Sequence, residues 1–172
     1  MNLRKRLGLG ILIFVVLAIL LLFSIRLFGV KEIDDVNPLM CNEEDWEYIE
    51  KSDVLWVVPL FENVSIANNS EWVGRIKGMN KSLGLHGVYH KYNEFGVERD
   101  REYLNLGIRE FEEAFEFTPR MFKAPQLNLS WENRALLIGE GFEIREKLNQ
   151  ITHKVYHCND SGMFKNWVID LF

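Results

Sequence analysis

The segment Leu83-Gly-Leu-His-Gly-Val-Tyr-His90 is a short apolar run that ends in two histidines around a glycine. A run of this length that ends at a turn residue is typical of a buried β-strand. Similar short runs recur along the chain and alternate with longer charged segments of helical period. The pattern predicts strand-helix units around a parallel sheet, and therefore an α/β fold.

Outward from this segment, the sequence predicts a series of strands and helices without a linker or internal repeat. The clearest predicted helix is residues 99–117, whose aromatic stripe is expected to pack in the core and which ends at Thr118 and Pro119. A second helix is predicted at residues 130–139, with Ser130 as its N-cap. Residues 30–172 are therefore treated as one domain. The predicted strands are residues 30–36, 53–61, 83–90, 120–126, 154–158 and a weaker one at 141–144.

The N-terminal region differs from the rest of the chain. Arg4, Lys5 and Arg6 precede 19 uncharged residues, from Leu7 to Ile25. A helix needs about 20 such residues to cross a bilayer, and basic flanks stay in the cytoplasm. We expect a cytoplasmic basic tip (residues 1–6), a single transmembrane signal anchor in the lipid bilayer (residues 7–28), and an exported domain. A cleaved secretory signal is the alternative, but the apolar run is long and no small-residue cleavage site follows it.

Charge and cysteine content restrict the function. The net charge of the chain is -5. The predicted exported domain lacks Arg4, Lys5, Arg6 and Arg26, so it has 16 basic and 25 acidic residues and a net charge of -9. This argues against a nucleic-acid partner. Two cysteines, Cys41 and Cys158, exclude a four-cysteine zinc site. A disulfide between them would close a loop of nearly the whole domain, and two free buried thiols are the alternative.

In parallel strand-helix folds, functional groups collect at the carboxyl ends of the strands. The spacing of His86 and His90 can bring both imidazoles onto one metal ion, and Asp34 or Asp35 can add a carboxylate. The other aspartate would then take a proton from water. The alternatives are histidines that are ordinary polar residues at a sheet end and aspartates that cap a helix. The residues at the predicted strand ends are Asp34, Asp35, His86, His90, Lys123, Pro125 and His157.

The motifs Ile33-Asp-Asp-Val36, Leu83–His90 and Phe122-Lys-Ala-Pro-Gln126 resemble, in order and spacing, the polysaccharide deacetylase superfamily of NodB-like carbohydrate esterases. The closest resemblance, over about residues 30–160, is to the branch with Asp-Asp-Val and His-Gly-x-x-His motifs. It implies a distorted (β/α)7 barrel, trimmed in this short chain. It also implies one divalent metal, usually zinc, and removal of acetyl groups from amino sugars or acetylated polymers.

The resemblance also assigns roles to individual residues. It implies that Asp34 is the general base, that Asp35, His86 and His90 are metal ligands, and that His157 is the general acid. Lys123, Pro125 and Tyr89 are expected to contact substrate or support the site. The exposed Tyr92 is a second candidate for stacking on sugar rings, and His153 is expected on the surface. A disulfide between Cys41 and Cys158 would lie at the mouth of the site.

Two other functions stay open at this point. Lys123 replaces the arginine that usually braces the catalytic aspartate in the superfamily, and no acidic motif follows the fifth strand to orient His157. Both departures favour a catalytically degenerate carbohydrate-binding or scaffold protein on the same fold. A membrane-bound interaction domain without a metal is the third possibility. The sequence predicts neither the sugar nor the oligomeric state.

Overall fold

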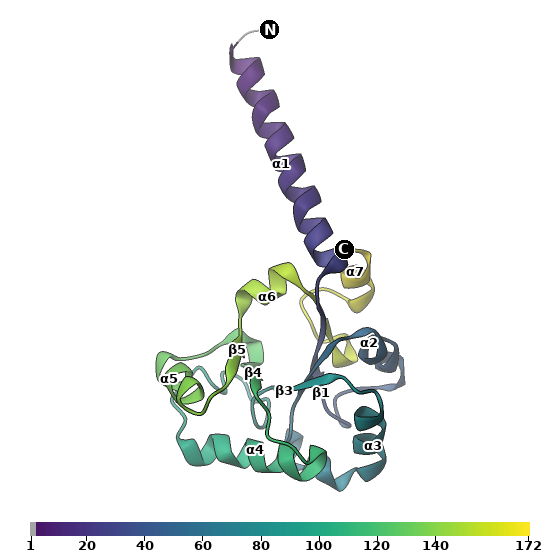
Figure 1. The fold of residues 1–172 in the computed structure, drawn as a ribbon, viewed down its shortest axis with the longest axis vertical. Coiled ribbons are helices and arrows are strands. Elements are labelled where there is room, and N and C mark those ends of the chain that lie inside the picture. Colours follow the sequence, from purple (N-terminus) through teal and green to yellow (C-terminus); the bar gives the residue numbers. More distant parts are fainter. Residues whose placement is uncertain (1–2) are drawn as a thin grey trace.

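The computed structural model describes residues 3–172, and side chains from residue 7 onward. Met1, Asn2 and the side chains of residues 3–6, all in the predicted basic tip, lie outside the described part. Helix α1 (Leu3–Phe28) projects from the rest of the chain as a single rod (Figure 1). Within Leu7–Phe28 an 18-residue window has a mean hydropathy of 3.1, and none of its residues is buried. This helix is therefore long and apolar enough to cross a membrane.

Six parallel strands form the sheet, in the order β5-β4-β3-β2-β1-β6. Consecutive strands from β1 to β5 are neighbours, and β6 returns to pair with the free edge of β1. The described strands therefore form a barrel that is open between β5 and β6, which confirms the predicted trimmed barrel. The strands are β1 (Lys31–Val36), β2 (Val54–Val57), β3 (Ser82–Leu85), β4 (Met121–Lys123), β5 (Glu143–Arg145) and β6 (Lys154–His157).

The strands end earlier than the sequence predicts. Residues 58–60 and 86–90 follow β2 and β3 outside any strand, Phe61 begins a short 3-10 helix, and residues 124–126 lie beyond the end of β4. The prediction placed all of them within strands. Gly87 has a φ of 69°, in the left-handed region that strands do not use. The polar residues of the histidine motif consequently lie in a loop above the sheet.

The two predicted helices are confirmed, each slightly shorter than expected. Helix α4 (Arg101–Phe115) begins where the Asp100 carboxylate accepts a hydrogen bond from Tyr103 N, and it ends at Glu116, whose backbone is left-handed. Helix α5 (Trp131–Gly139) is capped by the Ser130 hydroxyl, which accepts from Asn133 N. The other helices are α2 (Trp46–Lys51), α3 (Ser70–Gly78), α6 (Lys147–Thr152) and α7 (Asn166–Leu171).

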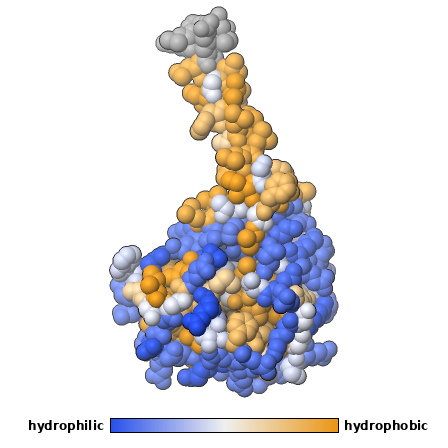
Figure 2. All heavy atoms as spheres, in the orientation of Figure 1, coloured by the Kyte–Doolittle hydropathy of each residue, from blue (hydrophilic) through white to orange (hydrophobic). Residues whose placement is uncertain are grey.

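The helices divide between the outside of the barrel and one of its ends. Phe111 and Phe115 of α4 are buried with Phe122 of β4, as the aromatic stripe predicted. Helices α6 and α7 instead lie at the end of the domain next to α1 (Figure 1). On the face shown in Figure 2 the domain is mainly hydrophilic with some apolar patches, whereas α1 is largely apolar.

Candidate metal and catalytic site

Asp34 and Asp35 are consecutive, yet both line one cavity at the carboxyl end of β1. Successive side chains of a regular strand point to opposite faces of the sheet. The pairing of β1 with β2 shifts register between Ile33 and Val36, and Asp35 has a φ of 64°. This irregularity rotates the second aspartate to the same side as the first. Aspartate is among the residues that tolerate a left-handed backbone best.

The loop between His86 and His90 is built around the buried carboxylate of Glu94. That carboxylate accepts hydrogen bonds from the backbone N–H groups of Val88, Tyr89 and His90. A Cβ atom on Gly87 would lie 2.2 Å from Glu94 Oε2. Glycine is therefore required after the first histidine because the carboxylate fills the space that a side chain would need.

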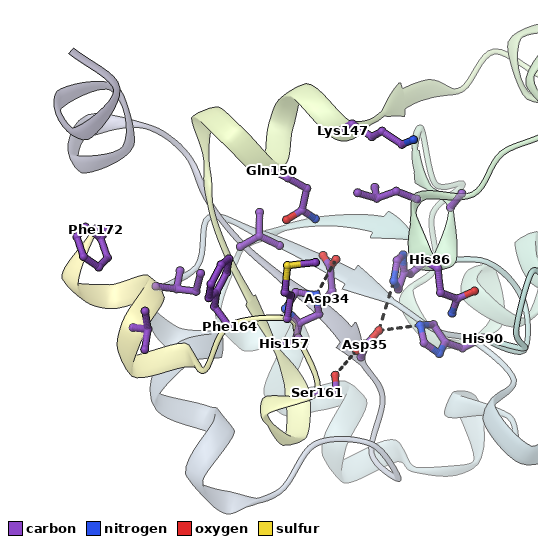
Figure 3. A pocket seen from close by; sticks show the side chains of 18 of the residues that line it. Asp34, Asp35, His86, His90, Lys147, Gln150, His157, Ser161, Phe164 and Phe172 are labelled. Carbon is purple, nitrogen blue, oxygen red and sulfur yellow. Dashed lines mark hydrogen bonds and ion pairs between the residues drawn. The ribbon is translucent and has the colours of Figure 1, made fainter. Parts of the chain in front are cut away.

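The Asp35, His86 and His90 side chains converge (Figure 3). Asp35 Oδ1 lies 2.8 Å from His90 Nε2 and 3.3 Å from His86 Nε2, and the three potential ligand atoms are all within 4.8 Å of one another. His86 Nδ1 donates to the carbonyl of Lys123 at 2.9 Å, so Nε2 of the neutral ring carries the lone pair. Two imidazole nitrogens and a carboxylate oxygen that converge in this way are the ligand types that zinc and similar ions bind, and the residues present therefore fit a divalent metal ion.

The same contacts shift the ionisation of the groups. Burial acts to raise the pKa of Asp35, but the contacts with His86 and His90 outweigh it and hold the pKa well below its usual range. Burial also acts to lower the pKa of His90, and the contact with Asp35 outweighs it, so the pKa is raised. The other oxygen of Asp35, Oδ2, accepts from the Ser161 hydroxyl at 2.7 Å. The Asp35 carboxylate is thus ionised and fixed in orientation.

Asp34 belongs to a buried network of charges. Its Oδ1 lies 2.7 Å from Lys123 Nζ, and the same ammonium group lies 3.2 Å from Glu32 Oε2. Glu32 Oε2 also accepts from Trp56 Nε1, and Glu32 Oε1 lies 2.6 Å from His153 Nδ1. A lysine cannot grip one carboxylate with two parallel bonds as arginine does, but here its single nitrogen bridges two carboxylates.

His157 stands on the other side of Asp34, with Nε2 3.6 Å from Asp34 Oδ2 (Figure 3). Its ring is covered by Gly162, where a Cβ atom would lie 2.4 Å from His157 Nδ1. Nδ1 is buried and has no hydrogen-bond partner among residues 3–172. This agrees with the sequence, which has no acidic motif to orient His157: no described carboxylate accepts a hydrogen bond from its Nδ1.

A disulfide joins Cys41 and Cys158, with 4.7 Å between the two Cα atoms. Cys158 follows His157 directly, and Cys41 lies in the loop after Asp35. The bond therefore fastens the loop after β1 to the loop after β6, beside the cavity. Both loops carry residues of the candidate site.

Three residues of the site were not predicted: Glu94, Glu32 and Ser161. Glu32 stands two residues before Asp34 on the same strand, and the period of two places both side chains on one face of the sheet. Two acidic residues on one face of a buried strand could therefore have identified Glu32 as a site residue. Nothing in the spacing singles out Glu94 or Ser161, because both act through loops whose path the sequence pattern does not predict.

The remaining predicted residues are placed as follows. Pro125 is buried, and its ring is close to Gly87. Tyr89 lies outside the cavity, and its ring packs against Tyr103, at 5.9 Å between centroids. Tyr92 is 92% exposed. The prediction that His153 is a surface residue is wrong, because the residue is half-buried against Glu32.

Solved structures provide the comparison for this fold. A CE4 family pseudoenzyme from Bacillus anthracis, in a mutant form, matches with a TM-score of 0.56 at 15% identity, over 74% of this chain and 55% of its own. A peptidoglycan N-acetylglucosamine deacetylase matches with a TM-score of 0.54 at 13% identity, over 67% and 54%. A family 4 carbohydrate esterase from Streptomyces lividans, in complex with acetate, matches with a TM-score of 0.52 at 11% identity, over 67% and 60%.

These similarities concern the fold. The chain spans little more than half the length of each of these three proteins. No protein-family model matches the sequence, and no curated protein matches it. The fold of this chain is that of the polysaccharide deacetylases, in agreement with the resemblance of its motifs.

Proposed function

We propose that this protein is a membrane-anchored, metal-dependent hydrolase that removes acetyl groups from a carbohydrate in the cell envelope or outside the cell. One observation carries the proposal: a single cavity brings together an Asp-His-His ligand set, a second buried carboxylate and a histidine that faces it. The fold of polysaccharide deacetylases supports the same reading.

In the proposed site, Asp35, His86 and His90 hold one divalent ion. Imidazole and carboxylate ligands suit zinc, although other first-row metals bind such a set. When bound, the ion supplies Lewis-acid polarisation of the acetyl carbonyl and lowers the pKa of water. Glu94 keeps the backbone of His90 in place, and the Lys123 carbonyl fixes the tautomer of His86.

Asp34 and His157 carry the proton transfers in this proposal. Asp34 accepts a proton from the attacking water, while Lys123 holds its carboxylate in place. Water adds to the acetyl carbon, the bond from this carbon to the sugar nitrogen or oxygen breaks, and acetate leaves. His157 gives a proton to the departing atom, which leaves the sugar with a free amine or hydroxyl.

The proposed location follows from the two ends of the structure. Residues 7–28 anchor the chain, residues 1–6 lie in the cytoplasm, and residues 30–172 lie outside it. The disulfide supports this arrangement because such bonds persist in oxidising compartments. Protease added to intact cells should degrade the domain; a domain that is degraded only after lysis would contradict the topology.

Acetate release tests the activity. The full chain in detergent, supplied with zinc, should release acetate from acetylated amino-sugar oligomers. Asp34→Asn should lower kcat by roughly 10²–10⁴-fold, the usual range for a general base. Glu98→Gln neutralises an exposed carboxylate and serves as the matched control. Full acetate release by Asp34→Asn would contradict the assigned base.

A carbohydrate-binding protein without turnover is the second candidate. It is favoured by the buried His157 Nδ1 that lacks a partner and by the likeness to a family 4 pseudoenzyme. Calorimetric binding of an acetylated oligomer to the zinc-loaded chain, without acetate release over a day, would favour this candidate over the hydrolase.

A further inference from the structure

The cavity that contains Asp34 and Asp35 is much larger than the candidate catalytic site. Its volume is about 970 Å³, at the upper end for small-molecule pockets. Beyond His157 it continues toward Phe164 and Phe172 (Figure 3), and its lining also includes Arg26 of α1. The wall in this outer part is largely apolar and is lined by Val155, Phe164, Val168, Ile169 and Phe172.

This apolar wall does not suit a sugar polymer. A sugar ring exposes hydroxyl groups on its whole rim, and burying them against aliphatic side chains leaves them without hydrogen-bond partners. An alkyl chain has the opposite requirement and gains about 0.8 kcal/mol for each methylene group that it buries. The inner part of the cavity is polar and the outer part is apolar. Its occupant should therefore be amphiphilic, with the polar end at the inner part and the apolar end at the outer part.

Exposed apolar side chains also lie on α6 and α7, the two helices that contribute residues to the cavity. We call the following five residues the apolar collar: Leu148 and Ile151 of α6, and Met163, Trp167 and Leu171 in and before α7. They are 52–92% exposed. Large contiguous apolar patches are rare on monomeric soluble proteins, and tryptophan is enriched at membrane interfaces. The collar lies at the end of the domain where α1 joins it (Figure 1).

The link between α1 and the domain is short and tightly packed, which keeps the collar at the membrane. Only two residues separate α1 from β1. A Cβ atom on one of them, Gly29, would lie 2.8 Å from the carbonyl oxygen of Thr152 in α6. Arg26 Nη1 donates to the carbonyls of Gln150 and Ile151 at 2.9 and 3.2 Å. The domain is therefore held against the end of the proposed anchor.

One positive charge lies at the α1 end of the cavity. Arg26 of α1 lines it there, whereas Lys147, which also lines the cavity, is drawn on the side of His86 in Figure 3. Arginine has five N–H donors, of which the carbonyl bonds of Arg26 use those of one nitrogen. A phosphate group that joins a sugar to a lipid would be complementary in charge to this region.

We propose that the substrate is an acetylated amino sugar carried through phosphate on a membrane lipid, which enters the cavity from the bilayer surface. The sugar reaches Asp34 and the ligand set, while the first methylene groups of the lipid lie along Phe164 and Phe172. The inference rests on the proposed function of the same site, and it names the class of substrate on which that site acts.

The test uses the full zinc-loaded chain in lipid nanodiscs and two probes that differ only in the tail: N-acetylglucosaminyl dodecyl phosphate and N-acetylglucosaminyl methyl phosphate. The dodecyl probe should have a kcat/KM at least about 10-fold higher, since a few buried methylene groups suffice for that factor. Phe164→Ser and Phe172→Ser should each reduce this ratio. Trp131→Ser should not, because Trp131 is also an exposed aromatic residue (78%, against 58% for Phe164 and 55% for Phe172) but lies on α5, outside the cavity.

Partition of the tail into the nanodisc acts on all variants alike, so the change of ratio isolates the contact with the cavity. A photoreactive diazirine at the end of the dodecyl tail adds a readout that needs no turnover, and its crosslinks should map to residues 163–172. Equal kcat/KM for the two probes, or crosslinks elsewhere, would overturn the inference and leave the hydrolase proposal standing. Crosslinks at 163–172 without acetate release would support the lipid site and overturn the hydrolase proposal instead.

Discussion

Replacement of Gly87 by alanine tests how the site is built. The Cβ atom would lie 2.2 Å from Glu94 Oε2 and 2.6 Å from the Pro125 ring, at a backbone φ of 69°. A left-handed backbone costs a non-glycine residue about 1–2 kcal/mol, and overpacking a filled site costs about 1–3 kcal/mol. Together they predict a loss of about 2–5 kcal/mol in the free energy of unfolding.

Gly74→Ala is the matched control, with the opposite sign. Gly74 lies within α3, and its Cβ atom would meet nothing within 4 Å. Alanine in a helix interior should stabilise the protein by about 0.5–1 kcal/mol. Thermal unfolding of the full chain in detergent, followed by tryptophan fluorescence, should show Gly87→Ala unfolding roughly 6–15 °C lower, at about 3 °C per kcal/mol.

The same variant should weaken metal binding, because Glu94 supports the backbone of His90. Loss of such an outer support typically lowers metal affinity by about 10–100-fold. Unfolding of Gly87→Ala at the wild-type temperature, or an equal loss of stability in both glycine variants, would refute the reasoning from close packing.

Three further predictions concern stability. Lys123→Met leaves two buried carboxylates without their shared partner and should cost about 3–5 kcal/mol in urea denaturation; a cost below about 1 kcal/mol would show that the network is not buried as described. Removal of the disulfide by Cys41→Ser with Cys158→Ser should cost about 2–5 kcal/mol, and unchanged stability of the double variant would contradict a bond in the native protein. Lys51 holds the pKa of Asp170 below its ordinary value, so the ionised carboxylate stabilises the fold above about pH 4 and that contribution is lost as the pH falls further. Asp170→Asn should therefore be less stable than wild type at pH 7, with a difference that narrows as the pH falls below about 4; a difference independent of pH would argue against the ion pair.

The sequence predicts the architecture of this protein better than the details of its site. Apolar runs of strand length and the aromatic stripe of residues 99–117 depend on burial, which a periodic pattern reports directly. The strand ends were less accurate. The run from Leu83 to His90 stays partly apolar after β3 has ended, and only the left-handed Gly87 shows where the chain turns.

The unpredicted parts of the site depend on contacts between distant segments. Glu94 acts on the loop of His90 because the chain folds back over that loop, and Ser161 reaches Asp35 across 126 residues. The bulge that turns Asp34 and Asp35 to one side is likewise a product of pairing between β1 and β2. Such arrangements leave no periodic trace in the sequence.

The central claim is that Asp35, His86 and His90 form a metal site, and elemental mass spectrometry of the purified full chain tests it most directly. Wild type should carry about one divalent ion per chain, and His86→Ala with His90→Ala should carry almost none. His153→Ala, which removes a histidine that contacts Glu32, should keep the ion. A folded wild-type protein without metal after incubation with zinc, or a double variant that retains the ion, would contradict the account.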